Sequence, residues 1–305
     1  MTAVAERLHA NEVAIDESLV RALLTEQFTE WARLPIERVP APGSDHVLYR
    51  LGEELVVRLP RKEGVDAQVD KERTWLPRLE PLLPHAVPTP VARGGPVETY
   101  PFSWSVYRWL EGANPPHGIE STELAIDLAR FVAALQFIDT EGGPRAGEQN
   151  FGRGEPLARR DRRTRAAIAE LTGIVDVNAV TMAWEHALGA TPCNGRPSWV
   201  HGDLTPENLL VRDGRLAAVI DFGCLGVGDP ACDLMVAWSV LAGEARRAFR
   251  AELDVDDAAW ARARGWALST ALIALPYYAA THPPRAANAR YRIAEVLADL
   301  SRRSA

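Results

Sequence analysis

The residues whose types and spacing could do chemistry lie in the segment WVHGDLTPENLLVRDGRLAAVIDFGCLGVGDPACDL, which begins at Trp199. Asp203 and Asn208 share one loop-like stretch, and Asp221 follows the apolar, strand-like run LAAVI. A carboxylate can accept or orient the proton of an attacking hydroxyl, and carboxylate and amide oxygens are hard ligands that suit Mg²⁺. These residues therefore have the chemistry that phosphoryl transfer requires, which depends on positioning and on charge neutralisation.

Each of these residues alone would be weak evidence for a catalytic site. An aspartate after a strand is usually a cap or turn residue, Asn208 alone would be a turn residue, and His201 alone would be a satisfied core histidine. The joint pattern H-x-D-x-x-x-x-N, followed by a strand and the triplet Asp-Phe-Gly, has the spacing of a kinase catalytic loop. This joint pattern favours the catalytic interpretation over the structural one.

The same segment resembles the aminoglycoside phosphotransferase superfamily, which has a protein-kinase-like fold. HGD, the strand end IDFG and the following GDPACDL carry the resemblance, which covers most of the chain and is densest from Trp199 to Leu241. The resemblance implies that Asp203 is the catalytic base and that Asn208 and Asp221 bind Mg²⁺.

Three further residues of this segment are expected to support the catalytic loop, namely His201, Asp229 and Asp233. Asp229 precedes Pro230, which is the pattern of a helix N-cap followed by proline at the first helical position. We therefore predict structural roles for Asp229 and Asp233 rather than a direct part in the reaction.

The elements that must position these residues follow from the periodicity of the apolar side chains. HVLYRL at 46–51 and ELVVRLP at 54–60 alternate and are joined by a short turn, which predicts a hairpin. A helix is expected over 69–76, and SWSVYRWL at 103–110 is expected to form a further strand. The N-terminal part is therefore predicted to be a small sheet with one helix crossing it.

The composition changes at EGANPP, residues 111–116, and helical patterns dominate beyond this loop. We therefore predict an α+β, protein-kinase-like fold with two lobes. Residues 1–112 are expected to form a small β-rich, nucleotide-binding lobe that ends in the hinge. Residues 113–305 are expected to form a larger helical lobe with the catalytic loop and the acceptor site. Ser121 is an expected helix N-cap in this lobe.

The resemblance also implies contacts between the small lobe and the nucleotide. Ser44, Asp45 and His46 lie in PGSDH, which resembles the nucleotide-positioning loop of the family although it has one glycine rather than several. In the hinge-like strand SVYRWLEG, backbone groups around Trp109 and Glu111 would hydrogen-bond the adenine edge. The expected cofactors are ATP or GTP together with Mg²⁺.

Arg58 occupies the place at which kinases usually carry a lysine, and Glu72 stands where the carboxylate that pairs with this cation would be. Arginine keeps the positive charge but is longer and planar, so its phosphate contacts would differ from those of lysine. The alternative is that Arg58 and Glu72 are two exposed charges without a common role.

A run of acidic residues, AELDVDDAAW, precedes a helical pattern of the larger lobe. Asp256 and Asp257 in this run would attract a cationic acceptor if they belong to the acceptor site. The competing interpretation is that these acidic residues cap the helix and favour its positive N-terminal end.

Composition argues against several other classes of protein. The net charge of −7 lacks the basic footprint of a nucleic-acid-binding protein. Neither Lys62 nor Lys71, the only lysines, follows a glycine, which excludes a Walker-A loop, and the cysteines form no C-x-x-C pair. The longest apolar stretch, 266–280, is broken by Pro276, and no signal-peptide core is present. We therefore expect a cytoplasmic protein without a membrane or nucleic-acid partner.

The expected function is ATP- or GTP-dependent transfer of a phosphoryl group to a hydroxyl of a small molecule. The resemblance implies an aminoglycoside-like or other antibiotic as the acceptor, and hence antibiotic resistance. Two alternatives remain open from the residues, namely a metabolic kinase of the same fold that acts on a sugar, an amino alcohol or an amino acid, and a pseudokinase that binds nucleotide without turnover. The protein is expected to be a monomer or a homodimer.

Overall fold

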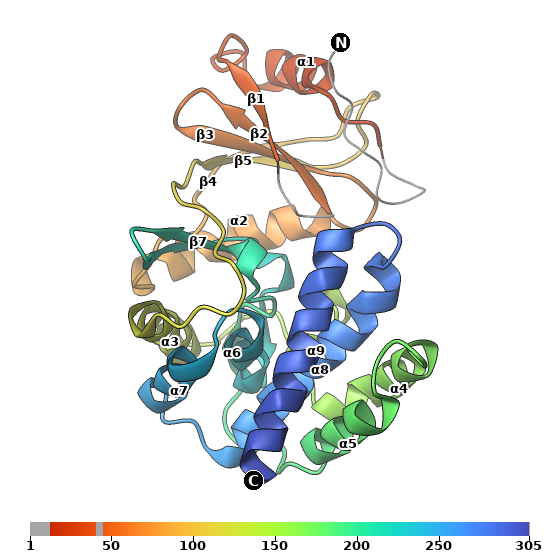
Figure 1. Cartoon of the computed structure of the whole chain (residues 1–305). Coiled ribbons are helices and arrows are strands. Elements are labelled where there is room, and N and C mark those ends of the chain that lie inside the picture. Colours follow the sequence, from red (N-terminus) through yellow and green to blue (C-terminus); the bar gives the residue numbers. More distant parts are fainter. Residues whose placement is uncertain (1–12, 41–44, 305) are drawn as a thin grey trace. The chain divides into compact units, whose positions relative to one another are not determined.

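The computed structural model describes residues 13–40 and 45–304, with side chains described as far as Arg302. These residues form two compact units, whose elements are labelled in Figure 1. The first unit takes in the chain up to Pro81, Ala86–Glu111 and Ala218–Gly223, and the second takes in Leu82–His85, Gly112–Ala217 and the chain from Cys224 onwards. Asp221 therefore belongs to the first unit, whereas Asp203 and Asn208 belong to the second.

An antiparallel sheet with strand order β1-β2-β3-β5-β4 forms the first unit's centre. Its strands are β1 (Ile36–Val39), β2 (His46–Leu51), β3 (Leu55–Pro60), β4 (Pro90–Gly94) and β5 (Trp104–Arg108). The predicted hairpin of β2 and β3 is present and pairs His46 with Pro60 and Leu51 with Leu55. Gly52 opens its turn with a φ of +61°, a conformation that glycine adopts without steric cost.

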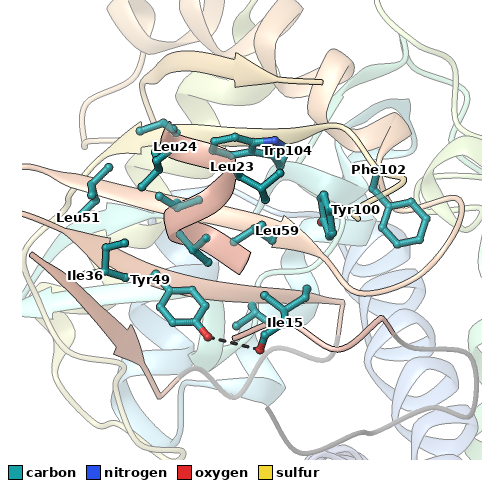
Figure 2. Close-up of a cluster of buried hydrophobic side chains, with 14 residues drawn as sticks. Ile15, Leu23, Leu24, Ile36, Tyr49, Leu51, Leu59, Tyr100, Phe102 and Trp104 are labelled. Atoms are coloured by element: carbon teal, nitrogen blue, oxygen red, sulfur yellow. Dashed lines mark hydrogen bonds between the residues drawn. The ribbon is translucent and has the colours of Figure 1, made fainter. Parts of the chain in front are cut away.

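Helix α1 (Glu17–Gln27) covers one face of this sheet. Asp16 caps the helix, because its Oδ1 accepts a hydrogen bond from the backbone N–H of Leu19 at 2.9 Å. Leu23 and Leu24 of α1 pack among alternate side chains of the strands, including the fully buried Trp104 (Figure 2). The alternation in β3 directs Arg58 to the other face, where α2 (Ala67–Leu79) provides its partner.

Helices dominate the second unit. They are α3 (Thr122–Phe137), α4 (Asp161–Glu170), α5 (Val177–Leu188), α6 (Val236–Ser239), α7 (Gly243–Glu252), α8 (Asp257–Tyr278) and α9 (Pro283–Ser304). Every residue from Trp260 to Leu272 in α8 is buried, so this helix is enclosed on all sides and is the centre of the unit. Helices α5 and α9 pack against α8, and Ser121 caps α3 as predicted.

Two short antiparallel pairs carry the motif residues. Strand β6 (Ser198–Val200) pairs with β9 (Gly226–Gly228), and it leads directly into His201. Strand β7 (Leu209–Arg212) pairs with β8 (Arg215–Val219), which leads to Asp221. The segment from His201 to Asn208 lies between these pairs and belongs to neither, so its conformation is fixed by side-chain contacts and not by strand pairing. Among the described helices, none combines the length and apolarity needed to cross a bilayer.

Candidate active site

The backbone of the catalytic loop is held by Asp233. This residue is fully buried, and its two carboxylate oxygens accept hydrogen bonds from the backbone N–H groups of His201 and Gly202, both at 2.7 Å. Burial raises the pKa of the Asp233 carboxyl, whereas His201 and the two N–H groups act in the opposite direction. Gly202 has a φ of +83°, and a Cβ there would lie 2.8 Å from the carbonyl oxygen of Cys224, so only glycine fits.

Asp229 supports the same region from the other end of the motif. Its Oδ1 accepts the backbone N–H of Ala231 at 3.0 Å, which confirms the predicted N-cap. Its Oδ2 accepts a hydrogen bond from Nε of Arg262 in α8 at 2.8 Å, and both side chains are buried. The hydrogen bonds of Asp229 and Asp233 thus agree with the structural roles predicted for these two residues.

Asp203 is oriented from both sides. The amide nitrogen of Asn208 donates to the carbonyl oxygen of Asp203 at 2.8 Å and to its Oδ2 at 3.2 Å. A guanidinium nitrogen of Arg153 lies 3.5 Å from Oδ1, and the backbone N–H of Asp203 donates to Nδ1 of His201. The carboxylate remains 36% exposed, so a hydroxyl from solution can reach it. This is the geometry that a general base needs.

Asn208 uses only its amide nitrogen in these contacts. Its amide oxygen accepts no hydrogen bond from the described residues and is therefore available as a hard ligand for a cation. The sequence prediction placed both functions in one loop, and Asp203 and Asn208 do lie in direct contact.

In the first unit, Arg58 forms the predicted ion pair with Glu72. One guanidinium nitrogen lies 2.8 Å from Oε1 and 2.7 Å from Oε2 of Glu72, and a second contacts Asp221. Burial lowers the pKa of Arg58, but the carboxylates of Asp221 and Glu72 outweigh this effect and raise it above its ordinary value. The side chain of Glu72 is 1% exposed, which excludes the alternative of two unrelated exposed charges.

Asp221 begins a turn that is fixed against α2. Its φ of +62° is in the left-handed region, which aspartate tolerates better than most residues. The ammonium group of Lys71 donates to the carbonyl oxygen of Gly223 at 2.6 Å. A Cβ on Gly223 would lie 2.3 Å from Oε1 of Gln68, so the side chain of Gln68 would have to move to admit a larger residue in this turn.

The other residues predicted to contact the nucleotide are Ser44, Asp45, His46 and Trp109, and most of them have partners within the protein. Ser44 lies outside the described residues. Asp45 pairs with Lys62 at 2.9 Å, and His46 is buried, which lowers the pKa of its imidazole to about 3 and keeps it neutral. The backbone N–H of Trp109 donates to the carbonyl oxygen of Glu54 at 2.7 Å, so the prediction for the hinge rests on other backbone groups.

Glu111 and the two acidic residues proposed for the acceptor also have partners. Glu111 lies 3.3 Å from a guanidinium nitrogen of Arg50. Asp256 caps α8, because its Oδ1 accepts the backbone N–H of Ala259 at 2.6 Å, and Asp257 lies 2.7 Å from Arg250. The capping interpretation is thus confirmed, and a role of Asp256 and Asp257 in acceptor binding stays a prediction.

Sequence reasoning missed Arg153, which contacts Asp203 in the second unit, and Tyr107, which contacts Glu72 in the first. The hydroxyl of Tyr107 donates to Oε2 of Glu72, and Tyr107 is 3% exposed. The register of β3 with β5 places Arg58 opposite Ser105, so Arg58 shares a face of the sheet with Tyr107. That pairing joins strands that are distant in sequence, so the local pattern did not reveal it.

We expect Tyr107→Phe to destabilise the first unit by about 1.5–3 kcal/mol, because it removes a hydrogen bond to a buried, ionised carboxylate. Thermal unfolding followed by circular dichroism measures this effect. Tyr277→Phe, at a tyrosine that is 55% exposed, is the matched control and should change stability by less than about 0.5 kcal/mol. Equal melting temperatures for the two variants would contradict the role given to Tyr107.

Comparison with known proteins identifies the class that this fold and site define. The family model described as the phosphotransferase enzyme family matches residues 36–266. The chain belongs to the phosphotransferase enzyme family, as its motifs predicted.

Individual relatives agree with this assignment. An aminoglycoside 3′-phosphotransferase from Escherichia coli is 32% identical over 78 residues, which span 23% of this chain and 29% of that protein. The GDP and kanamycin complex of an aminoglycoside 2″-phosphotransferase IIIa has a TM-score of 0.73 at 18% identity, and the match covers 93% of this chain and 99% of the chain of that structure. A macrolide 2′-phosphotransferase from Brachybacterium faecium has a TM-score of 0.61 at 22% identity and covers 92% and 97%. These similarities confirm the predicted kinase-like α+β fold.

Proposed function

We propose that this protein transfers the γ-phosphate of ATP or GTP to a hydroxyl of a small molecule, with Asp203 as the catalytic base. The observation that carries the proposal is the setting of Asp203. Its carboxylate is held by Asn208 and Arg153 on a loop that Asp233 fixes, yet it stays accessible to an acceptor. A pseudokinase would not need such an oriented and exposed base, so turnover is favoured over nucleotide binding alone.

Nucleotide binding is assigned to the first unit. Arg58, held by Glu72 and Tyr107, would supply positive charge for the phosphates. Structural relatives were solved with GDP or ADP, which supports a nucleotide of either base. Asn208 and Asp221 would hold Mg²⁺, because amide and carboxylate oxygens are hard ligands that suit this ion. Bound Mg²⁺ would neutralise negative charge on the triphosphate.

The acceptor class is proposed from the relatives. They are named for aminoglycosides and for macrolides, so an antibiotic is the first class to test, and resistance would be its consequence. A metabolic hydroxyl compound is the alternative. We further propose that the protein acts in the cytoplasm, where nucleoside triphosphates are available, as a monomer or a homodimer.

The direct test is a screen for acceptor-dependent release of nucleoside diphosphate from Mg-ATP and Mg-GTP. The panel contains aminoglycosides, macrolides, sugars, amino alcohols and hydroxy acids, and products are identified by mass spectrometry. We expect release above background with at least one acceptor and a product that carries one added phosphoryl group. The proposal would be contradicted if the protein neither bound nucleotide nor released nucleoside diphosphate with any acceptor of the panel.

A further inference from the structure

The second unit contains several buried arginines, and most of them are neutralised by a carboxylate. Arg246 lies 2.5 Å from Glu295, Arg262 lies 2.8 Å from Asp229, and Arg264 lies 3.1 Å from Asp299. This pairing is the rule for buried charges, since an uncompensated ion in a protein interior is strongly unfavourable.

Arg292, which is buried, and Arg160, which is half-buried, depart from this rule. Nε of Arg160 donates to Ser269 at 2.9 Å, and its guanidinium lies over the ring of Trp266. Arg292 is 6% exposed, donates to Thr270 at 3.2 Å, and has no partner for Nε. In the part of the chain that the structure describes, neither guanidinium has a carboxylate within ion-pair distance. Both are thus held by neighbouring hydroxyls of α8, without a fixed negative charge.

Arg153 joins these two residues to the catalytic loop. Its guanidinium contacts Asp203, and its charge lowers the pKa of both Arg160 and Arg292. Its Nε and a second guanidinium nitrogen are buried without a hydrogen-bond partner. We call Arg153, Arg160 and Arg292 the arginine cluster. It brings donors for a negative group close to the proposed base.

The electrostatics of the cluster agree with an uncompensated positive charge. Burial, together with the charge of Arg153, lowers the pKa of Arg160 to about 9. Burial also lowers the pKa of Arg292, although Asp203 and Glu207 act in the opposite direction. Glu207 is itself engaged, because its carboxylate accepts hydrogen bonds from the amide nitrogen of Asn288 at 3.1 and 3.3 Å. A bound anion would supply the missing charge.

The sequence does not show which arginines form this cluster. Arg160 lies in a run of arginines and ends the short 3-10 helix that precedes α4, and its neighbours Arg159, Arg162 and Arg163 are exposed, as a solvated face requires. Only Arg160 turns inward, towards Ser269. Arg292 lies within α9, and its hydrogen-bond partner, Thr270, belongs to a different helix, α8.

We propose that the acceptor of this enzyme carries an anionic group, a carboxylate or a phosphate, which the arginine cluster binds while Asp203 faces the reacting hydroxyl. That the bound molecule is a phosphorylation acceptor rests on the proposed function, but the anion site itself does not depend on it. It assigns to this chain a substrate opposite in charge to the polycationic aminoglycosides. Guanidinium groups suit both carboxylate and phosphate, which they bind through paired hydrogen bonds.

The first experiment measures anion binding without turnover. The protein is saturated with Mg²⁺ and a non-hydrolysable ATP analogue, and its melting temperature is followed with inorganic phosphate or malonate at an ionic strength kept constant with chloride. We expect one of these anions to raise the melting temperature of the wild type, and its identity tells phosphate from carboxylate. Arg160→Met and Arg292→Met should abolish the shift, and Arg163→Gln, on the exposed face of α4, should retain it.

The same variants show whether the arginines are uncompensated. Arg292→Met should leave the ligand-free melting temperature unchanged or raise it, because it removes an unpaired buried charge. Arg246→Met, which breaks the pair with Glu295, should lower it. A wild-type protein that gains no stability from either anion would overturn the inference, even if it is an active kinase. Conversely, an anion shift without binding of the ATP analogue would overturn the proposed function alone.

The second experiment uses matched acceptors, with glucose, glucosamine, gluconate and glucose 6-phosphate tested beside kanamycin and erythromycin. We expect gluconate, glucose 6-phosphate or both to be phosphorylated or to inhibit in competition with the acceptor that is used. Arg292→Met should raise the KM of an acidic acceptor by about 10- to 100-fold, the usual effect of losing a charge-assisted hydrogen bond, with the KM of ATP unchanged. Turnover confined to the cationic acceptors, or a change only in the KM of ATP, would contradict the inference.

Discussion

Asp203→Ala should lower kcat by about 10²- to 10⁴-fold while Mg-nucleotide affinity stays nearly unchanged, the usual span for a lost general base. In the wild type, the carboxylate is oriented by Asn208 and Arg153 and remains open to solution, so its loss removes the proton acceptor and leaves the first unit untouched. Initial rates with a saturating acceptor and nucleotide titrations measure the two effects separately.

The control for this variant is Asp213→Asn. Asp213 is a carboxylate of the turn between β7 and β8, its side chain is 93% exposed, and asparagine tolerates its φ of +53°. This variant should keep wild-type turnover. Asp203→Ala with turnover close to the wild-type rate, in a protein with an unchanged circular dichroism spectrum, would rule out Asp203 as the base.

Asp221→Asn should abolish the dependence of nucleotide affinity on Mg²⁺. A neutral amide is a much weaker ligand for this ion than a carboxylate, and asparagine also tolerates the left-handed backbone at position 221. Titration of ATP with and without Mg²⁺ measures the effect. The variant should bind ATP with the same affinity in both conditions, whereas the wild type should bind more tightly with Mg²⁺.

Asp221 contacts Arg58, so a second variant is needed to separate the loss of this contact from the loss of a metal ligand. Arg58→Lys retains a cation but not the planar donor that reaches both Glu72 and Asp221, so it should weaken ATP binding with and without Mg²⁺ alike. If Asp221→Asn instead keeps the magnesium dependence of the wild type, Asp221 is not a ligand of the ion.

Local sequence patterns predicted the parts of the fold that depend on neighbouring residues. The β2–β3 hairpin follows from alternation over a few residues, and the cap at Ser121 follows from a side chain that bonds to the first helical turn. The motif around Asp203 was also readable, because Asn208 lies in the same loop, and the structure shows the two side chains in contact.

Contacts between distant segments could not be predicted in the same way. Tyr107 reaches Glu72 only because β5 pairs with β3, and Arg153 reaches Asp203 from a loop far upstream in the sequence. Arg160 illustrates the difficulty best, since a run of arginines is typical of a solvated face and tertiary packing selects the one that turns inward. Charge compensation is a property of the folded interior and has no local sequence signature.

The central claim is that the chain phosphorylates a hydroxyl by means of Asp203. Its most direct test is mass spectrometry of an acceptor incubated with Mg-ATP or Mg-GTP and either the wild type or Asp203→Asn. The wild type should yield acceptor with one added phosphoryl group in amounts equal to the nucleoside diphosphate formed, and the variant should yield almost none. Equal product from both proteins would contradict it.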